Sequence, residues 1–133
     1  MRSTILAAAV LGILATAAQA QTLPTPAASI PPAARQIDKG IALVDGRGMT
    51  LYTFARDAEG RSACVAACAV NWPPLMAPVD AVPQGDYGLA ARSEGGRQWT
   101  YRGRPLYLWS GDRRVGESTG DGLLEGAWRI ARP

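Results

Sequence analysis

One seven-residue phrase occurs twice in this chain. "LYTFARD" occupies residues 51–57 and "LYLWSGD" occupies residues 106–112, so that Leu, Tyr and Asp each recur 55 residues downstream. Between Tyr and Asp, both copies carry a second aromatic residue in the same place. A match of this kind predicts an internal duplication, which limits the chain to folds that can be built from two similar units.

The duplication extends beyond the phrase. The shift of 55 also pairs Arg47-Gly48 with Arg102-Gly103, and a shift of 56 pairs Trp72 with Trp128. Each copy of about 50 to 55 residues is therefore expected to end with a tryptophan. Because only two copies exist, a pseudo-symmetric pair is favoured over an open solenoid.

The segments around the repeated phrases have the pattern of β-hairpins. Runs of alternating apolar residues flank glycine-containing turns at residues 45–48, 94–96 and 102–103. The first of these runs is "IALVDGRGMTLYTF", residues 41–54, and a closing strand is predicted at residues 127–132. The expected fold is mainly β, with two pseudo-equivalent antiparallel hairpin repeats packed as a small sandwich or barrel.

The repeated aromatic residues are predicted to lie in the core. Side chains alternate between the two faces of a strand, so Tyr52 and Phe54 share one face, as do Tyr107 and Trp109. Each ring can remove ~150 to 250 Å² of surface from water. The simplest interpretation is that these four rings form the inner faces of two equivalent strands.

The two repeated aspartates are predicted to shape turns. Asp57 and Asp112 follow the second aromatic residue by three positions and precede a polar segment. A short carboxylate at such a position can accept hydrogen bonds from nearby backbone N–H groups and end a strand. This role is favoured over a catalytic one.

The first twenty residues read as a cleavable export signal. Arg2 is followed by an apolar stretch and then by Ala18-Gln19-Ala20, a small-x-small cleavage site. The apolar stretch is shorter than the ~20 residues needed to span a bilayer, and no cysteine near the cleavage site offers a lipid attachment point. The expectation is a periplasmic protein with no membrane span and no lipid anchor.

The remaining chain is predicted to contain a linker and one domain. Residues 21–36 are rich in proline and alanine, which favours an extended, disordered linker. Residues 37–133 then form a single β-rich domain with a modest core. Its two repeats are placed at about residues 40–95 and 96–133, taking the paired phrases as markers.

The two cysteines lie in the stretch with most helical character. "SACVAACAVNWPPL", residues 62–75, predicts a short helix around Cys64 and Cys68, with Ser62 as its N-cap. In an exported chain with two cysteines, a structural disulfide is the default. The alternative is a copper-handling or electron-transfer site in which Met76 or Met49 adds a thioether to the two thiolates.

Several function classes have no support in the sequence. The chain contains no histidine and lacks a G-x-S-x-G elbow and an H-E-x-x-H motif, so no catalytic residue and no cofactor is predicted. The formal net charge is +3, and the arginines are scattered among acidic residues. Such a surface argues against nucleic-acid binding. The expected protein is not an enzyme.

Four motifs together resemble a known family. Residues 52–57 and 107–112 fit Y-x-[FWY]-x-x-D, and residues 62–75 fit S-x-C-x-x-x-C-x-x-x-W-P-P-L. Residues 97–109 contain Q-W-T-Y-x-G-x-P-L-Y, and residues 120–128 form a glycine-rich closing segment. The chain is thus similar to bacterial secreted repeat proteins, many of them predicted lipoproteins. The resemblance implies no activity. Relatives often carry histidine directly after the last tryptophan, where this chain has Arg129.

The leading hypothesis is a non-enzymatic binding or structural module of the cell envelope. Its partner would be a small ligand or an envelope protein. Candidate contact residues, if exposed, are the aromatic residues and flanking arginines of the hairpin before the second phrase: Tyr87, Trp99, Tyr101, Arg102 and Arg104. Because Trp99 and Tyr101 share a strand face, both should line the core or both should form a stacking platform. The core interpretation is favoured.

Overall fold

The computed structural model describes residue 12 and residues 31–133. The rest of the predicted signal peptide and residues 21–30 of the predicted linker lie outside the described residues. Within the described part, no helix has the length and apolar character that crossing a membrane requires. The elements, in chain order, are β1 (Ala33–Ile37), β2 (Gly40–Val44), β3 (Tyr52–Phe54), α1 (Ala67–Asn71), β4 (Met76–Ala77), β5 (Tyr87–Ala91), β6 (Arg97–Tyr101), β7 (Arg104–Pro105) and β8 (Trp128–Ile130).

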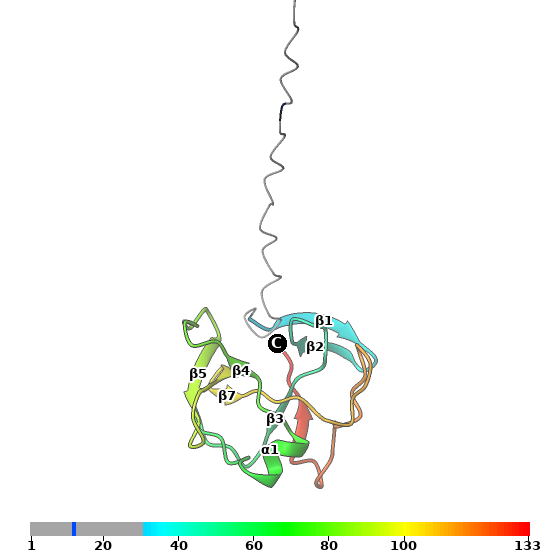
Figure 1. The fold of residues 1–133 in the computed structure, drawn as a ribbon. Coiled ribbons are helices and arrows are strands. Elements are labelled where there is room, and N and C mark those ends of the chain that lie inside the picture. The colour runs from blue at the N-terminus through cyan, green and yellow to red at the C-terminus, as the bar shows by residue number, and fades with distance from the viewer. Residues whose placement is uncertain (1–11, 13–30) are drawn as a thin grey trace, which may run out of the picture.

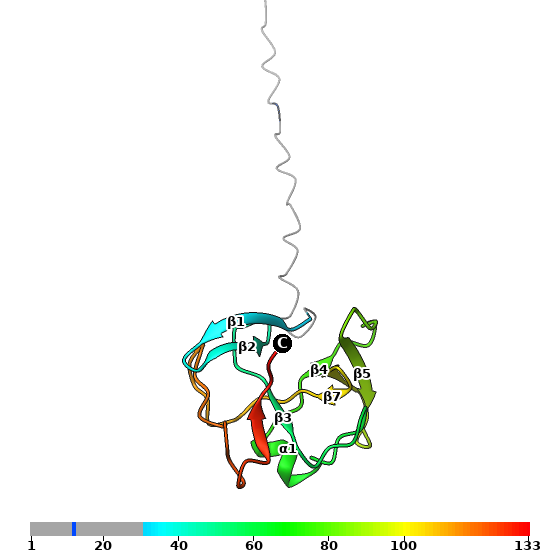
Figure 2. The ribbon, with the colours of Figure 1, turned by 180° about the vertical axis from the view of Figure 1, so that it is seen from behind.

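The strands form small antiparallel sheets. β1 pairs with β2, β3 pairs with β8, and β6 is flanked by β4 and β5, with β7 paired to its end. Figures 1 and 2 show the β1–β2 hairpin and the β5–β6 sheet on opposite sides of the molecule. No sheet of the described residues closes into a barrel. The mainly β fold is confirmed, and its packing is sandwich-like.

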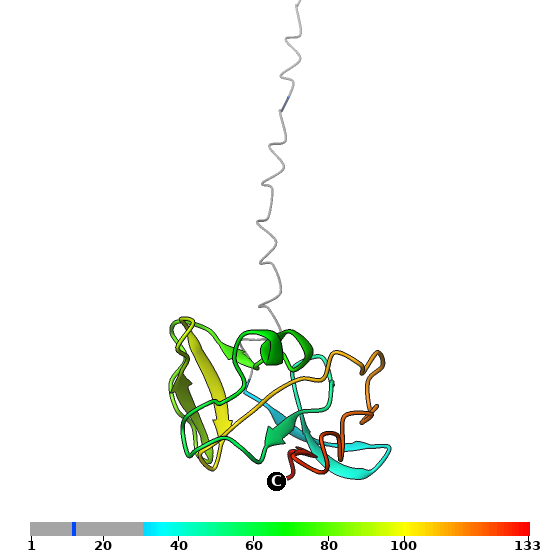
Figure 3. The ribbon, with the colours of Figure 1, turned by 90° about the horizontal axis from the view of Figure 1, so that it is seen from below.

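The two repeats exchange their last segments. The chain after α1 leaves the first repeat, and β4 joins β6 of the second. The C-terminal segment makes the reverse connection: β8 pairs with β3 of the first repeat, and the residues after it reach β2. Seen from below, the cyan β1–β2 hairpin and the yellow-green β5–β6 hairpin lie on opposite sides, with the green α1 between them (Figure 3). Each repeat therefore supplies a strand that its partner lacks.

Matching backbone hydrogen bonds show that this exchange is symmetric. Leu43 N–H donates to the carbonyl of Ala131 at 2.8 Å, and Trp99 N–H donates to the carbonyl of Leu75 at 2.9 Å. Leu43 and Trp99 are separated by the same 56 residues as Leu75 and Ala131. The two bonds are therefore one interaction made twice, each time between opposite repeats.

The pseudo-twofold axis passes between the two repeated tyrosines. Tyr52 N–H donates to the Tyr107 carbonyl at 2.8 Å, and Tyr107 N–H donates to the Tyr52 carbonyl at 2.9 Å. This reciprocal pair is how two residues face each other across an antiparallel ladder. The repeated phrases thus meet at the centre of the molecule, where both tyrosines are fully buried.

Burial of the repeated aromatic residues is confirmed for three of the four. Tyr52, Tyr107 and Phe54 belong to one core cluster, together with Trp72 and Trp128. Trp109 packs against this cluster but is only half-buried. The reason is its position beyond the segment that pairs across the axis, on a stretch that forms no strand. The two phrases are thus equivalent in position but unlike in regular structure.

The predicted hairpins are confirmed around residues 94–96 and 102–103. β5 and β6 flank the first turn, and β6 and β7 flank the second. In the second turn Arg102 has φ 47° and Gly103 has φ 80°. A two-residue turn with both φ values positive matches the twist of the flanking strands. The hairpin expected over residues 41–54 also forms at its turn, where Val44 is bridged to Thr50 and Leu51 N–H donates to the Leu43 carbonyl at 2.9 Å. Its last residues differ from the prediction, because β3 pairs with β8 rather than with β2.

Three predicted boundaries also differ from the structure. Residues 33–36, assigned to the linker, form most of β1, because β2 offers them an antiparallel partner. The predicted repeat boundary at residues 95/96 falls within the turn between β5 and β6. The β5–β6 hairpin is the counterpart of β1–β2, so the second repeat begins before β5. The helix begins at Ala67, after Cys64, and its N-cap is Ala66 rather than Ser62. The Ser62 hydroxyl instead contacts the Tyr107 hydroxyl at 2.7 Å.

Candidate functional site

The tyrosine of each repeated phrase binds the aspartate of the other phrase. The Tyr52 hydroxyl donates to Asp112 Oδ2 at 2.6 Å, and the Tyr107 hydroxyl donates to Asp57 Oδ2 at 2.7 Å. Hydrogen bonds to an ionised carboxylate are about twice as strong as those between neutral groups. The Y-x-[FWY]-x-x-D pattern is therefore a contact between repeats, and its two ends do not meet within one copy.

Each aspartate also holds the loop that follows its own phrase. Asp57 Oδ1 accepts a hydrogen bond from Ala63 N–H at 2.7 Å, and Asp112 Oδ1 accepts one from Thr119 N–H at 2.9 Å. Thr119 adds its hydroxyl at 2.6 Å. Both aspartates thus accept the backbone hydrogen bonds that their predicted turn-shaping role requires. One carboxylate ties a loop to the tyrosine of the opposite repeat.

Burial sets the protonation of the central tyrosines. It is the main cause that raises the pKa of the Tyr52 and Tyr107 hydroxyls far above the ordinary value of 10.0, and the nearby carboxylates raise it further. Burial also raises the pKa of Asp57, although Ala63 N–H, the Tyr107 hydroxyl and then Arg92 act in the opposite direction. Both tyrosines therefore remain proton donors in the folded state.

This arrangement predicts an alkaline limit to stability. The unfolded chain loses the protons of Tyr52 and Tyr107 near the ordinary tyrosine pKa of 10.0, whereas the folded chain keeps them. The stability contributed by the raised pKa is complete below that pH and is lost as the pH rises above it. Absorbance of tyrosinate during alkaline titration follows the ionisation of these two hydroxyls. Tyr52 and Tyr107 should ionise only with unfolding, whose midpoint is followed by circular dichroism.

The control is the Tyr52→Phe/Tyr107→Phe variant. It should be less stable at neutral pH but should lack the tyrosinate step that accompanies unfolding of the native chain. Ionisation of Tyr52 and Tyr107 near the ordinary value of 10.0, while circular dichroism stays native, would contradict the predicted effect of their burial.

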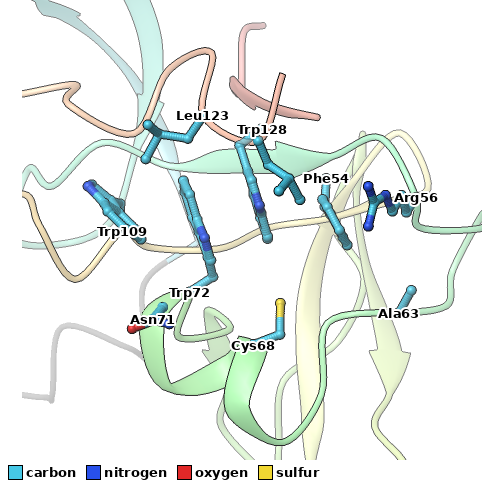
Figure 4. A pocket seen from close by; sticks show the side chains of 10 residues that line it. Phe54, Arg56, Ala63, Cys68, Asn71, Trp72, Trp109, Leu123 and Trp128 are labelled. Atoms are coloured by element: carbon cyan, nitrogen blue, oxygen red, sulfur yellow. The ribbon is translucent and has the colours of Figure 1, made fainter. Parts of the chain in front are cut away.

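Four aromatic rings form a continuous stack across the repeats. Phe54 stacks on Trp128 with ring centroids 4.2 Å apart, and Trp128 stacks on Trp72 at 3.8 Å. Trp109 continues the row beside Trp72 at 4.3 Å, with its ring tilted by 33°. The two central indoles are 3° from parallel. The order is symmetric about the central pair. Phe54 of the first repeated phrase lies on Trp128, which closes the second repeat, and Trp109 of the second phrase lies beside Trp72, which closes the first. Figure 4 shows the four rings in one row.

A pocket opens along the edge of this stack. It has a volume of about 490 Å³, and all four rings of the stack line it. In Figure 4 the α1 side faces the rings across the pocket, and the Cys68 sulfur points toward them. The other lining residues are Arg56, Ala63, Cys68, Asn71, Leu123 and Leu124. The wall is thus mainly apolar and is built from both repeats.

The polar groups of the pocket lie at its ends. The Arg56 guanidinium lies over the Phe54 ring, 5.9 Å from the ring centroid, and Asn71 lies at the end of α1. Leu123 and Leu124 are exposed at the rim. Figure 4 places Arg56 and Asn71 at opposite ends of the row of rings. A ligand in the pocket would meet flat carbon surfaces along its length and one positive charge at one end.

The predicted contact residues do not line this pocket. Trp99 is buried in a second core cluster, and Tyr87 and Tyr101 pack partly buried against that cluster. The favoured core interpretation is thus correct for Trp99, and the alternative of a surface contact is wrong, since its side of β6 faces the core. Arg102 is exposed, but it lies over the Tyr101 ring and pairs with Asp86 at 3.2 Å. Arg104 is exposed on β7 and lines two other surface pockets.

The predicted disulfide is confirmed. Cys64 and Cys68 are bridged, with their Cα atoms 5.2 Å apart. Both sulfurs are occupied by the bridge, so neither offers a thiolate to copper in this state. Met76, the third member of the copper alternative, lies on β4 with its methyl group against Gly96. Among the described residues, no group of three or more His, Cys, Asp or Glu side chains is placed to hold a metal ion.

Two residue pairs in the sequence could have shown that the loops around this site are counterparts. Extending the shift of 56 back from the tryptophans pairs Ser62 with Ser118 and Gly60 with Gly116. These pairs show that the cysteine loop and the glycine-rich loop at residues 116–126 are counterparts. The pocket residue Arg56 gave no signal, because the other repeat has Gly111 at its position.

The fold and site define a class of protein: two intertwined β-repeats with a shared aromatic core and a pocket between them. Residues 34–76 and 88–132 match the model of a family described as a secreted repeat of unknown function. The chain belongs to this family of secreted proteins. The second matched range includes β5, in agreement with the hairpin correspondence. No curated protein and no solved structure matches the chain.

Proposed function

We propose that this protein is a non-enzymatic binding module of the periplasm and that its binding site is the pocket along the four-ring stack. The observation that carries the proposal is the continuous aromatic wall shared by the two repeats. The export signal predicted at residues 1–20 and membership of a secreted family support the location.

The pocket has the properties of a small-molecule site. Its volume of about 490 Å³ falls within the ~300 to 1,000 Å³ that is usual for such sites. Ligand sites are mainly apolar and carry a few polar groups that fix the orientation of the ligand. Arg56 and Asn71 supply these groups here. The favoured ligand is therefore a flat, mainly apolar molecule that carries a negative group toward Arg56.

The proposal predicts binding of a simple probe with these properties. The chosen probe is 8-anilinonaphthalene-1-sulfonate, which joins aromatic rings to one sulfonate. It should bind the native protein with one-to-one stoichiometry, with an increase in its own fluorescence and quenching of tryptophan fluorescence. Ala63→Phe, which places a ring in the pocket, should weaken binding by at least about tenfold, the effect of ~1.4 kcal/mol.

Two further variants control this experiment. Val70→Phe adds the same ring at a position that is 73% exposed and does not line the pocket, so affinity should be unchanged. Arg56→Gln should weaken binding severalfold and should remove its dependence on ionic strength. Equal binding to the wild type and Ala63→Phe, at matched thermal stability, would contradict the proposed site.

A further inference from the structure

We infer that the Cys64–Cys68 bridge is a reversible redox site, which exchanges with the dithiol of a partner protein while the rest of the fold stays intact. The inference goes beyond the proposed ligand binding and does not depend on it. Three observations on residues 60–72 and 116–128 carry it.

The first observation is that the second repeat anchors the corresponding loop without a bridge. Under the shift of 56, Gly120 and Leu124 take the places of Cys64 and Cys68. The backbone between the anchors differs, because residues 123–127 form no helix. Both loops are nevertheless held by an aspartate at the corresponding N–H, and both lead into a tryptophan of the central stack. A covalent link is therefore not needed to anchor the ends of this loop, which argues that the bridge has a role besides stapling the fold.

The second observation is backbone strain between the two cysteines. Ala66 has φ 51° and ψ −123°, a conformation that residues with a Cβ rarely adopt. Its counterpart in the unbridged loop is Gly122, with φ 86°. Glycine is thus present where no bridge exists, and alanine is present where the bridge closes the loop. Opening the bridge would allow Ala66 to leave this conformation.

The third observation is the unequal access to the two sulfurs. Cys64 is fully buried, whereas Cys68 is partly exposed and lines the pocket. The pocket gives a partner thiolate access to Cys68, whereas Cys64 is enclosed in the aromatic core cluster. The geometry therefore assigns Cys68 as the sulfur that is attacked and Cys64 as the sulfur that leaves.

The exchange is balanced in atoms and electrons. A thiolate of the partner dithiol attacks Cys68 Sγ, the Cys64–Cys68 bond breaks, and a mixed disulfide forms between the partner and Cys68. The second thiolate of the partner then attacks the partner sulfur that is bonded to Cys68. This step forms the partner's disulfide and releases Cys68 as a thiol. This chain gains two electrons and two protons, and the partner dithiol becomes a disulfide. Loop residues 63–68 are then free to change the shape of the pocket wall.

Dithiothreitol serves as the dithiol in the first test. The oxidised protein is equilibrated in native buffer with graded ratios of reduced to oxidised dithiothreitol, and its thiols are counted by alkylation and mass spectrometry. The expected result is full, reversible reduction to two thiols with unchanged near-ultraviolet circular dichroism. Reduction that requires denaturant, or that abolishes the native spectrum, would overturn the inference. Probe binding is not measured, so this outcome is separate from that of the proposed function.

Ala66→Gly tests the coupling to strain. Glycine removes the penalty of the oxidised loop, so the equilibrium constant for reduction should fall by about fivefold or more. Ala67→Gly is the matched control, since this exposed neighbour lies in α1, and it should change the constant by less than about twofold. Equal constants for the wild type and Ala66→Gly would show that reduction releases no strain at this position.

Single-cysteine variants test the order of attack. In Cys64→Ser, the Cys68 thiol should react readily with a bulky maleimide in the native protein. In Cys68→Ser, the Cys64 thiol should react at least about tenfold more slowly, because reaction rate follows thiol access. Faster labelling of Cys64 than of Cys68 would reverse the assignment.

Discussion

Trp128→Ala lowers the free energy of unfolding by about 3 to 5 kcal/mol, the loss usual for removal of a large buried aromatic side chain. Trp128 is 2% exposed and stacks on both Trp72 and Phe54. Its ring also lies perpendicular to the Tyr107 ring, with the two centroids 5.1 Å apart. Its removal opens a cavity where the two repeats share their core, and nearby rings cannot close it without leaving their stacked positions. Urea unfolding followed by far-ultraviolet circular dichroism measures the loss.

Position in the stack decides the size of this effect. Trp72→Ala should cost about as much as Trp128→Ala, because Trp72 is the pseudo-symmetric partner and is also buried. Trp109→Ala should cost only about 1 to 2 kcal/mol, since Trp109 is half-buried and stacks on one ring. If Trp109→Ala costs as much as Trp128→Ala, the central indole pair does not dominate the core.

The second large effect concerns the crossed hydrogen bonds. Asp112→Ala should lower the free energy of unfolding by about 3 kcal/mol, because it leaves the buried Tyr52 hydroxyl without an acceptor for its proton and frees the loop at Thr119. In a double-mutant cycle, Tyr52→Phe and Asp112→Ala should show a coupling energy of about 1.5 to 3 kcal/mol, as expected for a hydrogen bond to a charged group.

The informative control pairs residues of the same phrase. Tyr52 and Asp57 are neighbours in sequence, but the Tyr52 hydroxyl bonds only to the other repeat. Tyr52→Phe and Asp57→Ala should therefore be additive within about 0.5 kcal/mol. Strong coupling within the phrase, with weak coupling between phrases, would contradict the crossed arrangement.

The exchange of segments makes the two repeats one cooperative unit. β4 of the first repeat lies in the sheet of the second, and β8 of the second lies beside β3 of the first. The crossed tyrosine–aspartate bonds and the alternating stack repeat this exchange at the level of side chains. Neither repeat completes its own sheet or its own core. Unfolding monitored by different probes should accordingly give one transition.

Much of the local structure could be predicted from the sequence. The turns at residues 94–96 and 102–103, the closing strand near residue 128 and the Cys64–Cys68 bridge follow from short-range patterns. These features depend on residues a few positions apart, whose geometry is fixed by turn chemistry and by alternation along a strand. The assignment of residues 33–36 to a linker failed because the strand they form depends on its pairing with β2.

The pocket could not be predicted in the same way. Phe54 and Trp109 of its wall were predicted to lie in the core, but Arg56 and Ala63 stand at variable positions of their motifs. They reach one surface with Leu123 only after the repeats interlock. Trp99 and Tyr101, the alternative contact surface, belong to a separate core cluster. Alternation predicts that these two residues share a face, but it does not say which side of the sheet is covered.

Residue patterns alone establish that the chain is duplicated, that it is built from hairpins, which aromatic residues recur and which cysteines pair. Which copy each segment joins is visible only in the folded molecule. The physical reason is that the two copies offer nearly the same partners: a strand, a tyrosine or an indole of one repeat has an equivalent binding position in its own repeat and in the other. Local patterns are identical for both choices, and only the packing of the whole chain distinguishes them.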